Sequence, residues 1–217
     1  MDITPIITEI LGNADKAGIG ILIKALFEKE IIQISNLTRK KAAHLVETLK
    51  IILNKPNIKD IKPEKLIEKI EDIEDETLQP ILENILIGNK NEVIRQQWIN
   101  LLESAILGYS IHPIYIETLR LLDGIDANVL KFISDFRKEG NRLRNSEIEV
   151  ALQQRKIENP TEEMVRDSLS NLVERGLCDV NNLQGKPRYS DMNSENIYIS
   201  QFGKKFLFMV GEKSPES

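Results

Sequence analysis

The sequence predicts a mainly α-helical protein: an N-terminal helical bundle followed by a winged-helix-like C-terminal module with a small β-hairpin. Three observations support this fold class. Apolar residues make up 41% of the 217 residues and aromatic residues only 5%. The apolar residues recur at three- and four-residue spacing, which places them on one face of a helix. Long stretches such as residues 64–79 contain neither glycine nor proline, the usual helix breakers.

Residues 1–124 are predicted to form the helical bundle domain. Proline suits the first turn of a helix, where its missing N–H would have no partner, and glycine suits the residue after the last turn. These signals stand at Pro63, Pro80 and Pro113, and at Gly88, Gly108 and Gly124. Together with the apolar spacing they predict helices at residues 3–33, 35–54, 63–73, 78–87, 91–107 and 113–122, with Asp75 or Thr77 capping the helix that contains Pro80.

Residues 125–210 are predicted to form a second, winged-helix-like domain. Its expected elements are helices at 126–138, 146–152 and 161–175, a strand at 177–180, a loop at 181–195, a strand at 196–200 and a helix at 202–210. Ser146 is expected to cap the second of these helices. The order helix, helix, helix, strand, strand, helix is typical of a winged helix. Residues 211–217 are expected to form a disordered tail.

Charge and cysteine content narrow the class of protein. The net charge of −5 gives no overall attraction to nucleic acid. The single cysteine, Cys178, excludes an intrachain disulfide and suits the reducing cytoplasm, where we expect the protein to act. The start of the chain lacks the basic segment of a secretory signal. The most apolar window, residues 17–27, is too short to span a bilayer and is predicted to be a buried helix.

No motif for catalysis or for metal or cofactor binding is present. The sequence has no HExxH zinc motif, no GxSxG nucleophile motif and no phosphate-binding glycine loop. The histidines, His44 and His112, are expected to have structural roles, with His112 at a helix entry because it precedes a proline. Trp98 is predicted to anchor the core, and Cys178 to be a buried small apolar residue. We therefore expect a protein that is not an enzyme and needs no cofactor or metal.

Two groups of charged residues are candidate binding surfaces. The acidic residues Glu68, Glu71, Asp72 and Asp75 recur at three- and four-residue spacing, so one helix face is expected to be negative, either as a solvated face or as a docking surface for a basic protein. Basic residues that could contact nucleic acid are Arg137, Lys138, Arg142, Arg144, Lys186 and Arg188. The expected recognition helix, residues 161–175, carries several acidic residues, which would repel phosphate.

From about Leu78 to Phe208 the chain resembles the abortive infection alpha family. Three segments carry the resemblance: LQPILENILIGNKNEVIRQQWINLLESAI with Glu92 and Trp98, HPIYIETLRLLDGIDANVLKFI with His112–Pro113 and Asp126–Ala127, and LSNLVERGLCDV with the later YISQFGKKFL, containing Gly176, Gly203 and Phe206. Where the family commonly has threonine before the closing glycine, this chain has Ser200 and Gln201. The resemblance implies a helical protein linked to phage resistance, with no catalytic residues to carry over.

Three hypotheses about function follow. The first is a non-enzymatic interaction or regulatory protein of a phage-defence system, which binds a protein partner or a second copy of itself. The second is a DNA-binding winged-helix regulator. The third is a membrane-active toxin in which residues 3–33 form a membrane-surface helix.

Overall fold

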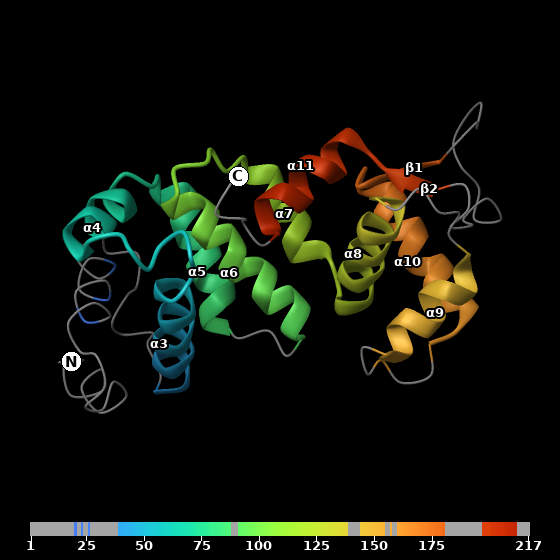
Figure 1. The fold of residues 1–217 in the computed structure, drawn as a ribbon, viewed down its shortest axis with the longest axis horizontal. Coiled ribbons are helices and arrows are strands. Elements are labelled where there is room, and N and C mark those ends of the chain that lie inside the picture. Colours follow the sequence, from blue (N-terminus) through green and yellow to red (C-terminus); the bar gives the residue numbers. More distant parts are fainter. Residues whose placement is uncertain are drawn as a thin grey trace. The chain divides into compact units, whose positions relative to one another are not determined.

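A computed structural model of the chain describes residues 20, 23, 26, 39–87, 91–138, 144–154, 157, 160–180 and 197–211, apart from the side chains of residues 39, 42, 137 and 138. These residues are mainly helical, with one two-stranded antiparallel sheet (Figure 1). In chain order the elements are α3 (Arg39–Leu53), α4 (Pro63–Glu71), α5 (Asp75–Ile87), α6 (Glu92–Ile106), α7 (Pro113–Leu121), α8 (Gly124–Lys138), α9 (Asn145–Gln154), α10 (Glu162–Glu174), β1 (Cys178–Val180), β2 (Ile197–Ile199) and α11 (Gln201–Val210). The expected mainly helical class with a small β-hairpin is confirmed.

The chain divides into two compact units. Unit 1 contains residues 1–119 and, from the far end of the chain, residues 209–217, whereas unit 2 contains residues 120–208. The sequence placed a domain boundary at residue 124 and gave residues up to 210 to the second domain. In the structure both boundaries fall inside helices, one in α7 and one in α11.

The core of unit 1 forms around α6. This helix contacts α3, α4 and α5, and all of its residues from Gln97 to Ile106 are buried. A helix that is covered on several sides needs apolar residues around most of its circumference. Trp98 contributes the largest apolar surface and is 2% exposed, which confirms its predicted place in the core.

Local signals set the ends of several helices in unit 1. The Asn91 side chain accepts hydrogen bonds from the N–H groups of Val93 and Ile94 at the start of α6. Gly108 ends that helix with φ of +90°, a conformation that glycine adopts without strain. At the start of α7 the Ile114 N–H donates to Nδ1 of His112, as expected for a residue at a helix entry.

The prediction that Pro80 lies in a first helical turn is wrong. Helix α5 starts at Asp75, and Pro80 lies inside it. The Leu78 N–H already donates to the Glu74 carbonyl, so the helix forms before Asp75 or Thr77 could act as its cap. Acidic residues at the first positions favour this early start, because the N-terminal end of a helix is partially positive.

Unit 2 contains α8, α9 and α10, the hairpin of β1 and β2, and most of α11. The three helices pack against one another, α10 contacts β1, and α8 contacts β2. The strands pair antiparallel with Cys178 opposite Ile199. Thr161 caps α10 by accepting a hydrogen bond from the Met164 N–H. The loop between the strands, residues 181–196, lies outside the described residues.

Some expectations for the first helices and for the tail also lie outside the described residues. Of the segment expected to be helical at 3–33, residues 20, 23 and 26 are described; they are helical, and the Ile23 and Leu26 side chains are each 2% exposed. Within the part of the chain that the structure describes, no helix has both the length and the apolar character required to cross a bilayer.

Candidate functional site

Three buried polar residues form one group on α6. Asn100, Glu103 and Ser104 are 3%, 1% and 0% exposed, although the helix around them is apolar. Their spacing of three and four residues places them on one side of the helix. Burial of polar groups costs free energy unless they find partners, so the contacts of these three residues must be identified.

Lys55, in the turn after α3, supplies the first contact of this group. Its Nζ lies 2.7 Å from Oε2 of Glu103 and 2.8 Å from Oδ1 of Asn100. The two ionised side chains are 12% and 2% exposed, so the pair is almost fully removed from water. Removing one member of such a pair leaves an uncompensated buried charge, which is strongly destabilising.

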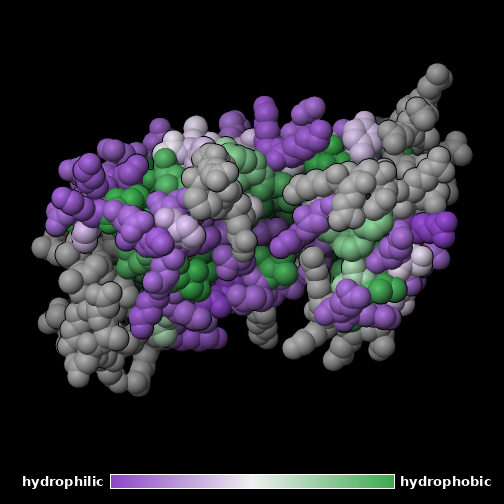
Figure 2. Space-filling view, viewed as in Figure 1, coloured by the Kyte–Doolittle hydropathy of each residue, from purple (hydrophilic) through white to green (hydrophobic). Residues whose placement is uncertain are grey.

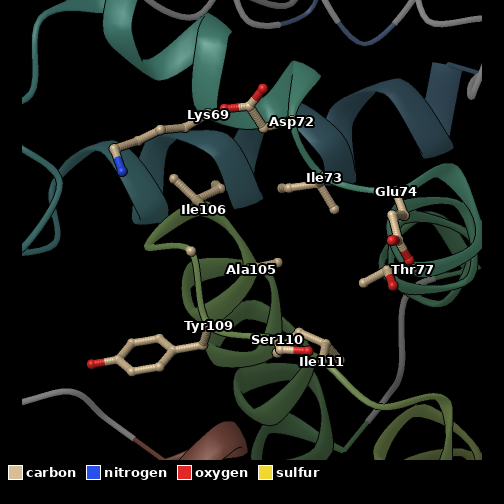
Figure 3. A pocket seen from close by; sticks show the side chains of 11 residues that line it. Lys69, Asp72, Ile73, Glu74, Thr77, Ala105, Ile106, Tyr109, Ser110 and Ile111 are labelled. Carbon is tan, nitrogen blue, oxygen red and sulfur yellow. The ribbon is translucent and has the colours of Figure 1, made fainter.

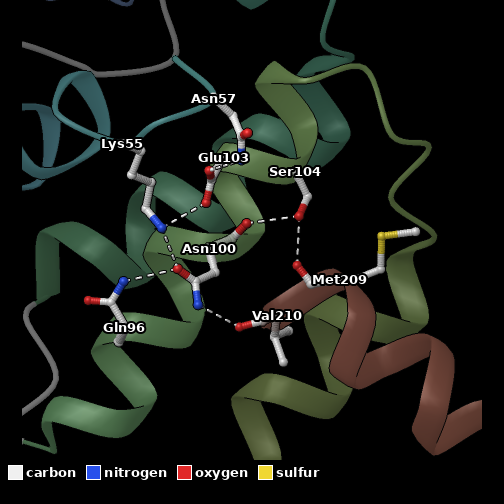
Figure 4. A network of polar contacts seen from close by, with 8 residues as sticks. All are labelled: Lys55, Asn57, Gln96, Asn100, Glu103, Ser104, Met209 and Val210. Carbon is white, nitrogen blue, oxygen red and sulfur yellow. Dashed lines mark hydrogen bonds and ion pairs between the residues drawn. The ribbon is translucent and has the colours of Figure 1, made fainter. Parts of the chain in front are cut away.

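The last turn of α11 supplies the second contact. The Asn100 side-chain amide donates to the Val210 carbonyl over 2.8 Å, and the Ser104 hydroxyl lies 2.7 Å from the Met209 carbonyl oxygen (Figure 4). The last carbonyls of a helix have no partner within that helix. The side chains of Asn100 and Ser104 therefore provide hydrogen-bond partners for the last carbonyl groups of α11. Residues 209 and 210 belong to unit 1 together with α6.

In unit 2 two carboxylates define the start of α8. Oδ1 of Asp123 accepts from the Ile125 and Asp126 N–H groups, and Oδ2 of Asp126 lies 3.4 Å from the Asp123 nitrogen. This is a reciprocal capping box. Burial raises the pKa of the Asp126 carboxyl, and the neighbouring charge of Asp123 adds to this effect, while the Ser168 side chain and the Arg175 charge oppose it.

Ser200 and Gly203 fix the start of α11 in unit 2. The Ser200 hydroxyl donates to the Gly176 carbonyl and accepts from the Gly203 N–H. A Cβ atom at Gly203 would lie 2.0 Å from the Leu177 carbonyl oxygen, so the close approach requires glycine. Ser200 thus fills the cap position at the start of α11.

Unit 1 also contains a cavity of about 280 Å3. Its apolar walls are Ile73, Ala105, Ile106 and Ile111, and its polar lining includes Lys69, Asp72, Glu74, Thr77, Tyr109 and Ser110. Glu74 and Thr77 lie on one side and the Lys69 ammonium group on the other, with isoleucine side chains between them (Figure 3). This hollow combines apolar walls with charged groups at its edge.

The acidic residues that the sequence singled out lie beside this cavity. Glu68, Glu71, Asp72 and Asp75 are all exposed, on α4, in the turn that follows it and at the first residue of α5. Hydrophilic side chains cover α4 in the space-filling view (Figure 2). Asp72 alone among these four lines the cavity.

Most of the basic residues proposed for nucleic-acid contact lie outside the described residues. Arg144 is exposed at the start of α9. Arg137 and Lys138 end α8, but their side chains lie outside the described residues, as do the whole residues Arg142, Lys186 and Arg188. Helix α10 exposes Glu162, Glu163, Asp167 and Glu174.

No group of three or more histidine, cysteine, aspartate or glutamate side chains suited to a metal ion occurs among the residues described. Cys178 is 1% exposed, and burial raises the pKa of its thiol to about 12. The sequence reasoning missed Asn100, Glu103 and Ser104. The available signal was their polar character at helical spacing within an otherwise apolar helix.

Comparison with known proteins gives one match. The family model described as abortive infection alpha matches residues 25–210, so the likeness begins well before Leu78, where the sequence first resembled the family. No curated protein and no solved structure matches the chain. The capped helices, the Trp98 core and the Gly203 closure described above all fall within the matched range. The chain belongs to the abortive infection alpha family.

Proposed function

We propose that this protein is a non-enzymatic interaction protein of a bacterial phage-defence system and acts in the cytoplasm by binding a protein partner. Membership of the abortive infection alpha family over residues 25–210 is the observation that carries the proposal.

The contacts of the buried polar residues support a role without catalysis. Glu103 is paired with Lys55, Asn100 and Ser104 contact the end of α11, and Asp126 belongs to a helix cap. Each of these side chains makes a hydrogen bond or ion pair within the fold, and it would have to break that contact to take part in a reaction. Stability, rather than chemistry, accounts for their burial.

The acidic segment at residues 64–76 is the surface we assign to the partner. It carries seven carboxylates and two lysines. Such a concentration of negative charge attracts a basic surface and repels nucleic acid. A protein partner with a basic patch is therefore the occupant that this surface fits.

The charge of α10 argues against DNA binding by unit 2. We propose that its three helices and hairpin form a winged-helix-like module. In a DNA-binding winged helix the position of α10 would face the major groove. The exposed face of α10 carries Glu162, Glu163, Asp167 and Glu174, which would repel phosphate groups.

A plaque assay tests the proposal. Bacteria that express the full chain are expected to form fewer plaques than cells with an empty vector, across a panel of phages. The variant Glu68→Lys/Glu71→Lys is expected to lose protection while its thermal melting temperature stays close to that of the wild type. A matched variant on α10, Glu162→Lys/Glu163→Lys, is the control for a general change of charge.

Two results would contradict the proposal. Undiminished protection by the α4 variant would show that the acidic segment does not bind the partner. Absence of protection by the wild-type chain against every phage tested would remove the defence role itself.

A further inference from the structure

The cavity of unit 1 differs from the rest of the acidic surface because it can enclose a ligand. Its volume of about 280 Å3 is close to the lower end of the range for small-ligand pockets. The walls Ile73, Ala105, Ile106 and Ile111 are between 2% and 8% exposed. They form an apolar lining into which an aliphatic chain fits.

The edge of this cavity carries two carboxylates without partners in the described part of the chain. Neither Asp72 nor Glu74 makes a side-chain hydrogen bond or ion pair there, and both are exposed. They belong to different positions of the turn between α4 and α5 and point in different directions (Figure 3). Glu74 is therefore the carboxylate that a cation in the cavity would meet, and a compact ammonium group needs less room there than the planar fork of a guanidinium.

We propose that this cavity binds a lysine side chain presented by the protein partner. The methylene stem would pack on the isoleucine walls, and the ammonium group would meet Glu74 at the edge, as charged side chains do when the stem is buried and the head stays wet. The inference rests on the proposed function, because it names the contact through which the acidic segment would hold its partner.

The surroundings of the cavity favour a protein over a free amine. The negative charge extends past the cavity along α4 to Glu68 and Glu71, further than a molecule of this volume could reach. A partner with several basic residues would use this whole surface and insert one of them. The ammonium group of Lys69 lies on the side of the cavity opposite Glu74. The negatively charged part of the cavity edge therefore does not extend to that side.

Titration of the isotope-labelled full chain with capped lysine, N-acetyl-lysine methylamide, tests the assignment by amide NMR. Saturable shifts are expected at residues 72–77 and 105–111, with a dissociation constant on the order of millimolar, as is typical for one small polar contact. Capped norleucine has the same stem without the charge and is expected to bind at least fivefold more weakly.

Substitutions identify the groups responsible. Glu74→Gln is expected to weaken binding about two- to fivefold, the range for a surface ion pair, whereas Asp72→Asn is expected to change it less. Lys69→Met is expected to strengthen it about twofold. The matched control Glu68→Gln keeps the cavity intact and is expected to change binding little. Ser110→Trp is expected to fill the cavity from an exposed position and abolish binding, with the melting temperature confirming that the variant folds.

Four outcomes would overturn the inference: no saturable shift, equal binding of capped norleucine, an equal loss from Glu68→Gln and Glu74→Gln, or tighter binding of the free amine 1,5-diaminopentane than of capped lysine. The last would assign the cavity to a small amine. Because the titration uses purified protein, its failure leaves the plaque assay and the proposed defence role unaffected, and failure of the plaque assay leaves the titration unaffected.

Discussion

The side-chain amide of Asn100 donates to the main-chain carbonyl of Val210, a residue 110 positions later in the sequence, over 2.8 Å. Both groups are buried, and the Asn100 side chain also accepts from Lys55 and Gln96. One residue thus connects the turn after α3, the middle of α6 and the end of α11. This position should be among the most sensitive in unit 1.

Asn100→Ala is expected to lower the free energy of unfolding by about 1–3 kcal/mol, because it leaves the Val210 carbonyl without its donor. Urea unfolding measures the change. Asn84→Ala is the matched control, since the Asn84 side chain makes a local hydrogen bond to Pro80 of its own helix. Equal losses of unfolding free energy in the two variants would show that the contact between Asn100 and Val210 stabilises the fold no more than a local hydrogen bond does.

The buried pair of Lys55 and Glu103 should be strongly coupled. Lys55→Met and Glu103→Leu are each expected to destabilise by about 3–5 kcal/mol, because each strands a buried charge, while the double variant should recover a large part of that loss. A double-mutant cycle in urea gives the coupling energy. Additive losses would mean that the two charges do not interact.

Gly203→Ala is expected to destabilise unit 2 by about 3 kcal/mol or more, since the added Cβ meets the Leu177 carbonyl and overpacking of this severity forces the backbone to move. Gly176→Ala is the control: its φ of +69° is strained for alanine, but no atom lies within 4 Å of the added Cβ. That variant should lose only about 1 kcal/mol. A reversed order of the two melting temperatures would contradict the packing shown here.

The buried Asp126 carboxyl should make stability depend on pH. Because its pKa in the folded protein is raised above 3.8, the folded state binds more protons than the unfolded state just above that pH. Its contribution to stability is therefore greatest below pH 3.8 and falls as the pH rises through the raised pKa. Asp126→Asn keeps an acceptor for the cap and should remove this fall, which denaturation at a series of pH values would reveal. If Asp126→Asn showed the same dependence of stability on pH as the wild type, the prediction would be wrong. Glu163→Gln, which replaces an exposed carboxyl, is the control and should keep the wild-type dependence.

Cys178 should not react with thiol reagents in the folded protein. It is 1% exposed, and a thiol with a pKa of about 12 carries almost no thiolate at pH 8. Labelling with a chromogenic disulfide is expected to be negligible in buffer and complete in denaturant. Fast stoichiometric labelling without denaturant would show that the β1 edge opens readily.

Local chemistry was predictable from the sequence, and contacts between distant residues were not. The helix entry at His112 and the terminal glycine at position 108 depend on neighbours within four residues. The predicted cap at Ser146 is wrong, because the helix begins one residue earlier and Glu147 accepts from the Arg144 N–H.

The polar contacts of α6 could not be predicted in the same way. The partners of Asn100 and Glu103 lie 45 to 110 positions away, and no periodic pattern links residues at such distances. The cavity is similar, since its walls come from the turn after α4 and from the end of α6. The acidic face of α4 was predictable from the sequence, but the cavity beside Asp72 was not.

The placement of Met209 and Val210 in unit 1 has a consequence for synthesis on the ribosome. All of unit 2 leaves the exit tunnel before the last two acceptors of the first unit become available to Asn100 and Ser104. The buried side chains of Asn100 and Ser104 therefore lack these two acceptors until α11 has been made, although their own helix is made about a hundred residues earlier.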